Sequence, residues 1–409
     1  MTGVTVIGMS GGPLPESALA VLASAGAVAG GARHLDAVAL PPSCERIVIG
    51  PLTDALDRLR AVAADEGSGP AVVLASGDPG FFGIVRRLRA EGFDPSVLVA
   101  PSSVATAFAR LGISWDGAVV ASAHGHDLRR ALNTCRAMPV VAVLTAPSAG
   151  ATELARGLLG WNRRIVVMER LGESDERVVG PLPAKDAATC AWRHPNVVVS
   201  LAEPDGGRAE PDGGRADNQP AAAPGGGWAL PESAYVHRDS MITKSEVRAV
   251  ALAGLRPRLG RLVWDVGAGS GSVGIECALL GAAVVAVDAD PRACAQVLQN
   301  AAAHGVGHAV RVVEGAAPGA LGGLPFPDAV FVGGGGTGTV AAVAALRPSR
   351  VVVTLAAIDR VAPAVQALRE NGFTVSGTQL AASRLTDLAG GSLRFAGTNP
   401  VVVLTGELS

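Results

Sequence analysis

A glycine-rich stretch in the second half of the chain has the composition of a ligand-binding loop. Residues 263–276 read VWDVGAGSGSVGIE, so an apolar run reaches a carboxylate and is followed by glycines that alternate with small residues. Glycines let a backbone turn sharply and approach a ligand closely. A loop that follows a strand and opens into a helix is where open α/β sheets bind nucleotides. Asp288 ends the next apolar run, where an acid can accept ribose hydroxyl groups.

Two kinds of ligand fit this loop. Residues 269–274 satisfy the GxGxxG pattern of dinucleotide sites, and Asp288 lies at the spacing expected for NAD. Asp265 favours a different ligand, because the residue at this position of an NAD site is normally apolar. A carboxylate two residues before the glycines suits the positively charged amino acid tail of S-adenosylmethionine (SAM). We therefore expect SAM, with an NAD-dependent oxidoreductase as the alternative of a different class.

Two more loops of the second half end apolar runs. Residues 314–321 read EGAAPGAL and follow the third run, where an adenine-contacting loop is expected. Residues 331–336 read FVGGGG and follow the fourth run, where glycines leave room for a bulky substrate. Ordinary turn chemistry explains glycines of this kind equally well.

The first half has loop candidates of its own. Residues 6–13 read VIGMSGGP, which is glycine-rich but lacks GxGxxG. Residues 76–80 read SGDPG after an apolar run, and an Asp-Pro turn flanked by glycines exposes backbone groups to a ligand. His124 follows another apolar run and is either a candidate to hydrogen-bond a substrate carboxylate or to move a proton, or a loop histidine bonded to the backbone. No histidine or cysteine spacing matches a metal site, so no metal is expected.

Apolar β-branched runs alternate with helical patterns before residue 203. The expected strands are residues 4–8, 71–75, 97–100, 118–122, 140–145, 164–169 and 196–201. The expected helices are residues 15–25, 52–65, 84–91, 104–111 and 151–159. Residues 17–32 are interpreted as a core helix and its exit, and not as a membrane span. Continuous apolar strands with crossover helices predict a largely parallel sheet covered on both faces.

The same pattern restarts after residue 228. A helix is expected at residues 244–255. The expected strands are residues 261–266, 283–287, 310–313, 329–332 and 350–354, with helices between them. Residues 375–380 and 399–405 are expected to pair as an antiparallel ending to a parallel sheet.

The clearest boundary between the two halves lies at residues 203–227. The heptapeptide EPDGGRA occurs at 203–209 and again at 210–216, followed by DNQPAAAPGGG. Such a segment has almost nothing to bury, so we expect a disordered Gly/Pro linker. The predicted domains are therefore residues 1–202 and 228–409, which agrees with a length of 409 residues that exceeds one hydrophobic core.

Composition excludes several classes of protein. Apolar residues make up 49% of the chain and charged residues 17%, which suits a well-buried α/β protein. The formal net charge of −2 provides no general basic field for nucleic acid. Five scattered cysteines indicate a reducing compartment, and the N-terminus lacks the basic segment typical of a signal peptide. We expect a cytoplasmic protein without nucleic-acid or membrane partners.

Six segments of the second half occur in a characteristic order. They are MITKSEVRAVAL (241–252), VWDVGAGSGSVGIE (263–276), AVDADP (286–291), EGAAP (314–318), FVGGGG (331–336) and NPVVVL (399–404). Together they resemble the C15-methylating, decarboxylating domain of the corrin pathway, a class I SAM methyltransferase with a Rossmann-like fold, over residues 228–409. By this resemblance the SAM site is lined by Thr243, Gly267, Ala268, Gly269, Ser270, Gly271, Asp288 and Ala316.

Two residues of the first of these segments have alternative roles. Lys244 is a candidate catalytic residue, or a surface charge at the start of a helix. Thr243 is a candidate N-cap of that helix, with Glu246 as its capping-box partner, and this role does not exclude contact with SAM.

The first half carries a second ordered series. It consists of GGARHL (30–35), LASGDPGFFGI (74–84), APSSVATAFARLGISW (100–115), VASAHGHDL (120–128) and MERLGESDERV (168–178). The series resembles the C5-methylating domain of the same pathway, in the tetrapyrrole methylase family, whose α/β fold has two lobes with SAM in the cleft between them. The resemblance assigns Gly77, Asp78, Pro79, Ser102 and Ser103 to the SAM site. The opening loop departs from the family pattern GxGPG, so no contacts are assigned there.

The two resemblances imply one fused enzyme of cobalamin biosynthesis. It would use SAM at two sites to methylate a reduced tetrapyrrole at C5 and C15, and would remove CO2 from the acetate on C12. Arginines that could receive the substrate carboxylates are Arg33, Arg129, Arg130 and Arg384, although an ordinary surface role is favoured for any one of them. A cleft for a macrocycle also suggests a homo-oligomer. A precorrin and its cobalt-containing counterpart present the same periphery, so both substrates stay open. A SAM-sensing regulator is disfavoured because two sites are expected and no basic DNA-binding helix is present.

Overall fold

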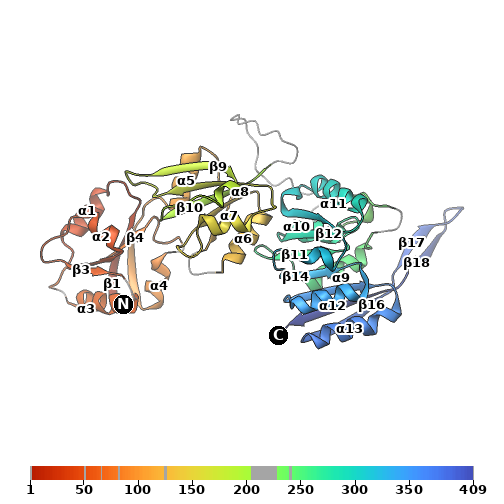
Figure 1. Cartoon of the computed structure of the whole chain (residues 1–409). Helices are drawn as coiled ribbons and strands as arrows, with labels where there is room; N and C mark the ends of the chain where they lie inside the picture. The colour runs from red at the N-terminus through yellow and green to blue at the C-terminus, as the bar shows by residue number, and fades with distance from the viewer. Residues whose placement is uncertain are drawn as a thin grey trace.

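A computed structural model describes residues 2–49, 52–65, 67–81, 83–123, 127–203, 228–238 and 242–408 (Figure 1). The described strands form three large sheets and one two-stranded ribbon. Figure 1 shows the two sheets of the first half at one end and in the middle of the molecule, and the third sheet at the other end. The predicted linker lies almost entirely outside the described residues.

The first sheet is parallel throughout, in the order β3-β2-β4-β1-β5. Its strands are β1 Thr2–Met9, β2 Ala27–Gly30, β3 Glu45–Val48, β4 Ala71–Ser76 and β5 Phe93–Leu98. The accompanying helices are α1 Glu16–Ala23, α2 Ala32–Asp36, α3 Leu52–Ala64 and α4 Ile84–Ala90. Helix α5 Ser103–Leu111 follows β5 and packs against the sheet of the second lobe. Apolar side chains of β4 are buried on both faces of the sheet, which confirms the predicted parallel arrangement for this lobe.

Two sequence expectations for this lobe are wrong. Residues 17–32 are not one helix with its exit, because α1 ends at Ala23 and β2 begins at Ala27. The strand expected at residues 97–100 instead spans Phe93–Leu98. Both errors have the same cause, since short runs rich in Ala and Gly, or interrupted by Pro, carry little strand periodicity.

The second sheet is mostly antiparallel, in the order β6-β7-β10-β8-β9. Its strands are β6 Val119–Ser122, β7 Val140–Leu144, β8 Arg163–Glu169, β9 Arg177–Pro183 and β10 Asn196–Ala202. The helices beside it are α6 Leu128–Ala137, α7 Ala151–Gly157 and α8 Ala184–Ala187. β6 and β7 pair in parallel, and the other three pairs are antiparallel, so the largely parallel sheet expected from the sequence is wrong here. A short β8–β9 connection permits an antiparallel hairpin without a crossover helix.

The third sheet has seven strands in the order β13-β12-β11-β14-β15-β19-β16. The strands are β11 Leu262–Val266, β12 Ala283–Asp288, β13 Val310–Glu314, β14 Ala329–Val332, β15 Arg350–Leu355, β16 Phe373–Leu380 and β19 Val401–Leu408. The helices are α9 Ser245–Leu255, α10 Ser272–Leu279, α11 Pro291–Ala303, α12 Gly336–Leu346 and α13 Val361–Glu370. β19 is antiparallel to both β15 and β16, which confirms the expected antiparallel ending.

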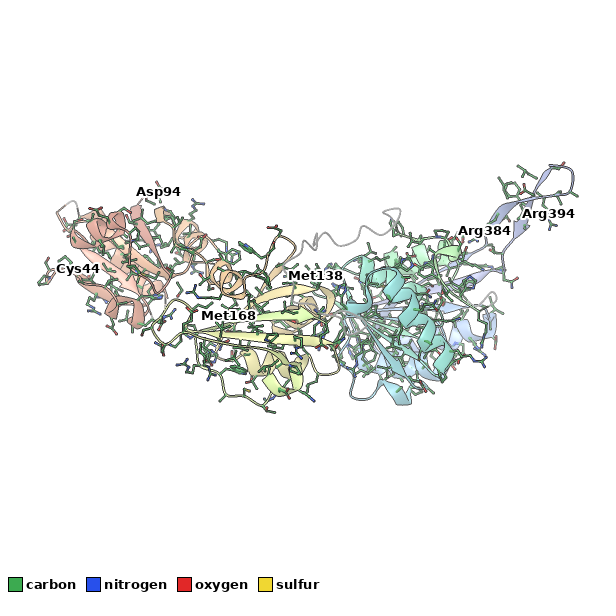
Figure 2. All side chains as sticks on the ribbon, turned by 90° about the horizontal axis from the view of Figure 1, so that it is seen from above. Cys44, Asp94, Met138, Met168, Arg384 and Arg394 are labelled. Atoms are coloured by element: carbon green, nitrogen blue, oxygen red, sulfur yellow. The ribbon has the colours of Figure 1, made fainter. Side chains whose placement is uncertain are left out.

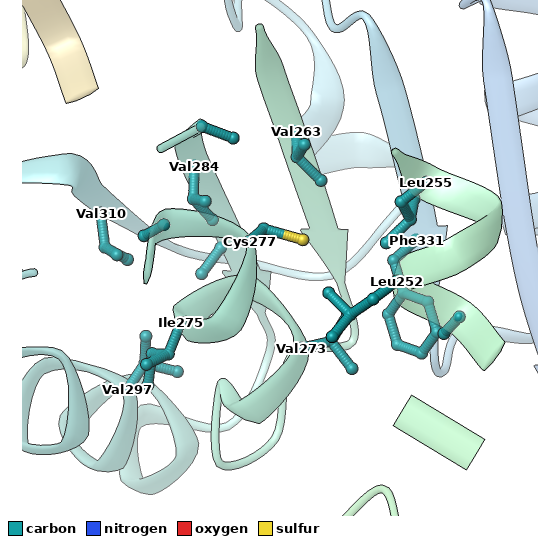
Figure 3. Packing of buried hydrophobic residues seen from close by; sticks show 14 of the residues in the cluster. Leu252, Leu255, Val263, Val273, Ile275, Cys277, Val284, Val297, Val310 and Phe331 are labelled. Atoms are coloured by element: carbon teal, nitrogen blue, oxygen red, sulfur yellow. The ribbon is translucent and has the colours of Figure 1, made fainter. Parts of the chain in front are cut away.

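The core on one face of this sheet contains the helix before β11 and the helix after the glycine loop. Figure 3 shows Leu252 and Leu255 of α9 and Val273 and Cys277 of α10 against Val263 and Phe331 of the sheet. All six side chains are buried. This packing holds α10, and therefore the loop before it, in place against the strand edges.

A ribbon of two strands, β17 Ser383–Asp387 and β18 Leu393–Gly397, was not expected from the sequence. It projects from the third sheet, with Arg384 near its base and Arg394 further out (Figures 1 and 2). Leu385, Leu393 and Phe395 are exposed on it. Strands that bury so little have no clear inside–outside alternation, which explains why the pattern was not recognised.

The two halves touch through apolar packing and through polar contacts. Ala137, Met138 and Trp161 of the first half belong to a hydrophobic cluster of the third sheet. Asp328, just before β14, accepts hydrogen bonds from Arg129 at 2.8 Å and from the Asn133 amide at 3.1 Å, both on α6. The Arg163 guanidinium of β8 donates to the backbone oxygen of His308 at 3.2 Å. These contacts place α6 beside the amino-terminal ends of β11 and β14.

Candidate functional site

The three glycine loops of the second half meet at one edge of its sheet. β13, β12, β11 and β14 are neighbouring parallel strands, so their carboxyl ends lie side by side. The Gly267 N–H donates to Val287 O at 2.9 Å, and the Gly315 N–H donates to Asp288 O at 2.8 Å. The Gly333 N–H donates to Val266 O at 2.9 Å. The loops at 267–271, 314–318 and 333–336 therefore form one continuous surface, as the sequence predicts.

Gly267 must be glycine for two independent reasons. Its φ of +73° lies in the left-handed region. A Cβ at this position would lie 2.7 Å from the backbone nitrogen of Gly334, so the first and fourth strand loops touch through their backbones. The contact leaves the edge of the sheet lined by peptide groups instead of side chains.

Asp265 lies directly beneath the loop. Its side chain is 1% exposed, and Oδ2 accepts a hydrogen bond from the Gly274 N–H at 2.8 Å. Oδ1 is buried without a partner among the described residues. Burial raises the pKa of Asp265 to about 7, and the Gly274 hydrogen bond acts in the opposite direction. A buried carboxylate oxygen in need of a donor fits the ammonium group of the predicted SAM tail.

Asp288 ends β12, as predicted, and its carboxylate is already partly used. Oδ2 accepts from the Gly269 N–H at 2.8 Å, and Oδ1 accepts from the Asp290 N–H at 2.9 Å. Ala316 lies in the adjacent loop, directly after Gly315. The Gly315 N–H donates to the Asp288 carbonyl. Ala268, Ser270 and Gly271 complete the loop, and Gly271 is the left-handed N-cap of α10.

The structure places Thr243 and Lys244 at the start of α9 and changes one of their expected roles. Lys244 is the N-cap residue, without a side-chain capping bond, and the helix begins at Ser245. The expected capping box of Thr243 and Glu246 is therefore wrong. The Glu246 carboxylate is held by Arg384 of β17 instead, at 2.5 and 2.8 Å. The Thr243 carbonyl accepts a hydrogen bond from Arg248 Nη1 at 2.6 Å.

A buried polar network behind the loop was not recognised in the sequence. Arg248 is fully buried and donates from Nε to Glu276 Oε1 at 2.5 Å. Asn300 of α11 is 1% exposed and donates to the backbone oxygen of Ser270 at 2.9 Å. The two contacts join residues that are 28 and 30 positions apart, so no local sequence pattern reveals them.

In the first half, the carboxyl ends of β1 and β4 and the segment after β5 meet closely. A Cβ on Gly8 would lie 2.5 Å from Gly77 O and 2.8 Å from Ala100 N. Gly77 has a φ of +61°, which favours glycine. Asp78 accepts the Gly80 N–H at 2.8 Å and so closes the turn that contains Pro79. The SGDPG segment is therefore a tight turn at the edge of the first sheet.

The two predicted serines lie at the start of α5. The Ser102 hydroxyl accepts the Ala105 N–H at 3.0 Å and caps the helix. Ser103 is the first helical residue, and its backbone nitrogen would lie 3.2 Å from a Cβ on Gly77. Both serines therefore adjoin the SGDPG turn.

A cluster of side chains bridges the two lobes beside that turn. Arg33 donates to Ser76 Oγ at 2.9 Å and to Glu173 Oε1 at 3.0 Å, and Glu173 belongs to the second lobe. His34 Nε2 lies 3.2 Å from Ser76 Oγ. Burial, followed by the Arg33 charge, lowers the pKa of His34 to about 4, so its ring is neutral near pH 7. The segment GGARHL signalled this region, but its partners were not predictable.

The other candidates have mixed outcomes. His124 lies outside the described residues. Arg129 is paired with Asp328, and Arg384 is paired with Glu232 and Glu246, so both are engaged by carboxylates of the chain itself. The stem of Arg130 packs against Gly260, where a Cβ would lie 2.9 Å from Arg130 Cγ.

Among the described residues, no three His, Cys, Asp or Glu side chains are gathered as metal ligands. No helix in the described part of the chain combines the length and apolar character needed to cross a membrane.

Comparisons with known proteins match both halves. The Precorrin methyltransferase domain family matches residues 233–405, and the Tetrapyrrole (Corrin/Porphyrin) Methylases family matches residues 7–186. A Sinorhizobium protein named precorrin-6Y C(5,15)-methyltransferase (decarboxylating) is 36% identical over 348 residues, which cover 82% of this chain and 78% of the relative. A Pyrobaculum calidifontis protein named probable cobalt-precorrin-6B C(15)-methyltransferase (decarboxylating) is 37% identical over 194 residues, which cover 46% of this chain and 97% of the relative.

Among solved structures, precorrin-6y C5,15-methyltransferase from Geobacter metallireducens is 30% identical and has a TM-score of 0.41. The match covers 44% of this chain and 97% of that one. The match with the Sinorhizobium relative covers most of both chains. The two matched families each cover one of the two halves that carry a glycine-lined sheet edge. The chain therefore belongs to the family of precorrin-6Y C(5,15)-methyltransferases (decarboxylating).

Proposed function

We propose that this chain methylates precorrin-6Y at C5 and C15 and removes CO2 from the acetate on C12, giving precorrin-8. The observation that carries this proposal is the relative of the same name, which is 36% identical and matches 82% of this chain. Two separate glycine-lined sheet edges support a division of labour. We assign C5 methylation to residues 1–202, and C15 methylation with decarboxylation to residues 228–409, joined by a linker at 203–227.

The family uses SAM as methyl donor, and we propose one SAM site in each half. In the second half the site would be formed by Thr243, Gly267, Ala268, Gly269, Ser270, Gly271, Asp288 and Ala316. In the first half it would be formed by Gly77, Asp78, Pro79, Ser102 and Ser103. The unpartnered Oδ1 of Asp265 supports the SAM site in the second half of the chain, because an ammonium group would satisfy it. The close approach of Gly8 and Gly77 supports the SAM site in the first half of the chain, since it leaves a backbone surface at the strand ends.

Bound SAM supplies an electrophilic methyl group, so the protein has mainly to align and to exclude water. The nucleophile is a carbon of the macrocycle, and no activated serine or cysteine is needed. Backbone loops that meet edge to edge, as Gly267 and Gly334 do, leave room for a flat, bulky substrate. In the decarboxylation, the electron pair of the broken C–C bond enters the conjugated ring, so no further cofactor follows. His124 and Lys244 remain the candidates for proton transfer.

A cobalt-containing substrate is the second candidate. The Pyrobaculum relative carries a cobalt-precorrin name, but it matches 46% of this chain, whereas the relative named for metal-free precorrin-6Y matches 82%. Rates measured with metal-free and cobalt-loaded substrate would decide between the two. None of the relatives reported above is named as an oxidoreductase, so the NAD reading of residues 269–274 receives no support.

The proposed division of labour can be tested in the full chain with one substitution in each half. Gly267→Val places a side chain against the backbone of Gly334. Gly77→Val places a side chain against the backbone of Ser103, at a position whose φ of +61° favours glycine. Mass spectrometry of the product should show that Gly267→Val loses one methylation and the CO2 release. Gly77→Val should lose the other methylation. Mixing the two variants should restore both reactions, and equal damage to both methylations by either variant would contradict the assignment.

We also propose a cytoplasmic homo-oligomer without nucleic-acid partners. The β17–β18 ribbon, with Leu385, Leu393 and Phe395 exposed, is the surface we would substitute first. Light scattering of the wild type and of Phe395→Ser would measure the oligomeric state.

A further inference from the structure

The segment that enters the second half lies across helices α10 and α11 before α9 begins. We define the strap as residues 228–238 and 242–244. Its described part contains one 3-10 turn, η1 Glu232–Ala234, and no strand. Backbone groups without a regular ladder need other partners, and buried ones that lack them are costly. The strap obtains these partners from three buried side chains of the methyltransferase body.

Glu276 of α10 is the first of these side chains. Its carboxylate accepts the Ala229 N–H at 2.6 Å and the Leu230 N–H at 3.0 Å. It also accepts the Tyr235 hydroxyl at 2.9 Å and Arg248 Nε at 2.5 Å. Burial raises the pKa of Tyr235, which keeps this hydroxyl a donor. One carboxylate, 1% exposed, therefore binds the beginning and the middle of the strap.

Arg248 of α9 binds both ends of the strap. Its Nη1 donates to Thr243 O at 2.6 Å, and its Nη2 donates to Leu230 O. The guanidinium is fully buried and lies 5.0 Å from the centre of the Tyr235 ring. Removal of one partner of a buried ion pair leaves the other charge uncompensated, so Arg248 and Glu276 are strongly held together. The carbonyl of Thr243, a predicted SAM contact, is thereby tied to the same side chain as Leu230.

Asn300 of α11 connects the strap to the glycine loop itself. Its Oδ1 accepts the Val236 N–H at 2.8 Å, and its Nδ2 donates to Val236 O at 2.8 Å. The same Nδ2 donates to Ser270 O at 2.9 Å. Ser270 is a predicted SAM contact, so a single amide holds the strap and the loop at a fixed separation. The side chain is 1% exposed, and water therefore cannot replace these bonds freely.

The end of the strap packs into the same hydrophobic core as α10 and β14. Ile242 belongs to the buried cluster that contains Val273, in the first turn after the glycine loop, and Phe331, at the end of β14. Gly271 faces α11 closely, since its Cβ would lie 3.0 Å from Val297. The strap, the glycine loop and the fourth-strand loop are thus packed as one body around the edge that the proposed function assigns to SAM.

We infer that Asn300, Arg248 and Glu276 are positioning residues for C15 methylation. They hold the strap so that Thr243 and the Ser270 loop face the methyl donor together. The strap is by this inference part of the second SAM site. The inference rests on the proposed SAM site of the second half, and it assigns no contact of these three side chains with SAM.

Asn300→Asp is the sharpest variant, because it is isosteric and keeps the acceptor for Val236 N–H. The substitution replaces the Nδ2 amide group, which donates to the carbonyls of Val236 and Ser270, with an oxygen that faces both carbonyls. We expect the KM for SAM in C15 methylation to rise about tenfold, as for the loss of one buried hydrogen bond near a binding site. C5 methylation in the same molecules should change by less than about twofold, which serves as an internal control.

The matched control is Asn371→Asp at the end of α13, whose amide donates to the single carbonyl of Ala367 at 2.8 Å. It should leave both methylations unchanged. Tyr235→Phe is a milder second variant that removes one donor from Glu276, and it should raise the same KM by a few-fold without lowering kcat. Hydrogen exchange of the backbone amides of residues 228–238 should increase in Asn300→Asp and in Tyr235→Phe, and not in Asn371→Asp.

The outcomes separate the inference from the proposed function. If the wild type binds no SAM in its second half, or does not methylate C15, the proposed function fails. If the wild type methylates C15 but Asn300→Asp and Tyr235→Phe behave like Asn371→Asp, the inference is overturned and the function stands. A loss of kcat at an unchanged KM for SAM would equally overturn the positioning role.

Discussion

The Asp288 carboxylate at the end of β12 accepts a hydrogen bond from the backbone N–H of Gly269, with 2.8 Å between Oδ2 and N. Its second oxygen accepts the Asp290 N–H at 2.9 Å, just before α11 begins at Pro291. One side chain therefore joins the glycine loop after β11 to the start of α11. Asp288 shapes the loop in addition to its predicted role as acceptor for ribose hydroxyls.

Asp288→Asn should weaken SAM binding in the second half by about tenfold or more, because an amide nitrogen would face a backbone N–H that now has an acceptor. C5 methylation should be unaffected. Isothermal titration with SAM, together with product analysis by mass spectrometry, measures both effects. An unchanged SAM affinity and an unchanged C15 methylation would remove Asp288 from the site.

Gly267→Ala and Gly305→Ala separate backbone strain from a steric clash. The two glycines have φ values of +73° and +70°, but a Cβ on Gly305 meets nothing within 4 Å, whereas one on Gly267 lies 2.7 Å from Gly334 N. Gly305→Ala should lower the free energy of unfolding by about 1 kcal/mol through strain alone. Gly267→Ala should cost about 1–3 kcal/mol more and should abolish C15 methylation.

Urea denaturation and a methylation assay check this pair. Equal losses of stability in the two variants would mean that the Gly334 loop moves aside freely. Retained C15 methylation in Gly267→Ala would show that the contact between the two loops is not needed for the reaction.

Asp265→Asn should stabilise the ligand-free protein and weaken SAM binding. Burial raises the pKa of Asp265 in the folded protein from 3.8 to about 7. The folded state therefore binds the proton more tightly, and its stability falls as the pH rises from about 4 through 7. A neutral amide removes this loss of about 4 kcal/mol but buries N–H groups without an acceptor, so at pH 8 the net gain in stability should be on the order of 2 kcal/mol.

The opposite effect on SAM is the decisive part of this prediction. If Oδ1 receives the ammonium group, the variant should bind SAM at least about tenfold more weakly at pH 8. Urea denaturation at pH 5 and pH 8 gives the stability, and titration with SAM gives the affinity. A variant that is more stable but binds SAM normally would place the ammonium elsewhere.

His34 should make the first half sensitive to acid. Its pKa falls from 6.5 to about 4 in the folded protein, because the ring is buried beside Arg33. The unfolded state therefore binds the proton more readily, and stability is full above pH 6.5 and is lost as the pH falls toward 4. The ring is not fully buried, so we expect a loss of about 1–2 kcal/mol over this range.

His34→Gln should flatten this dependence without changing the pH dependence of the second half. Denaturation curves at pH 4.5, 5.5 and 7 that follow a signal from each half would measure it. An equally steep loss in the variant would assign the acid sensitivity to other groups.

Much of the fold could be read from local pattern. Buried parallel strands such as β4 and β12 are continuous apolar runs, and a glycine loop after such a run requires a sharp turn whatever surrounds it. The loops at 76–80, 267–271 and 331–336 were therefore predictable, as was the antiparallel ending formed by β16 and β19. The edge strand β9 and the β17–β18 ribbon were missed because they bury little and show no strong alternation.

The contacts that hold the site were decided by the tertiary structure. Asn300 meets Val236 across 64 residues, and Arg33 meets Glu173 across 140, and no periodicity links such pairs. The expected Thr243–Glu246 capping box was wrong because the helix has Lys244 as its N-cap, and the Glu246 carboxylate accepts from Arg384, 138 residues away. Local sequence determined where the chain turns and which runs are buried. The folded chain alone decided which charged and polar groups satisfy one another, because that depends on which segments the packing of the core brings together.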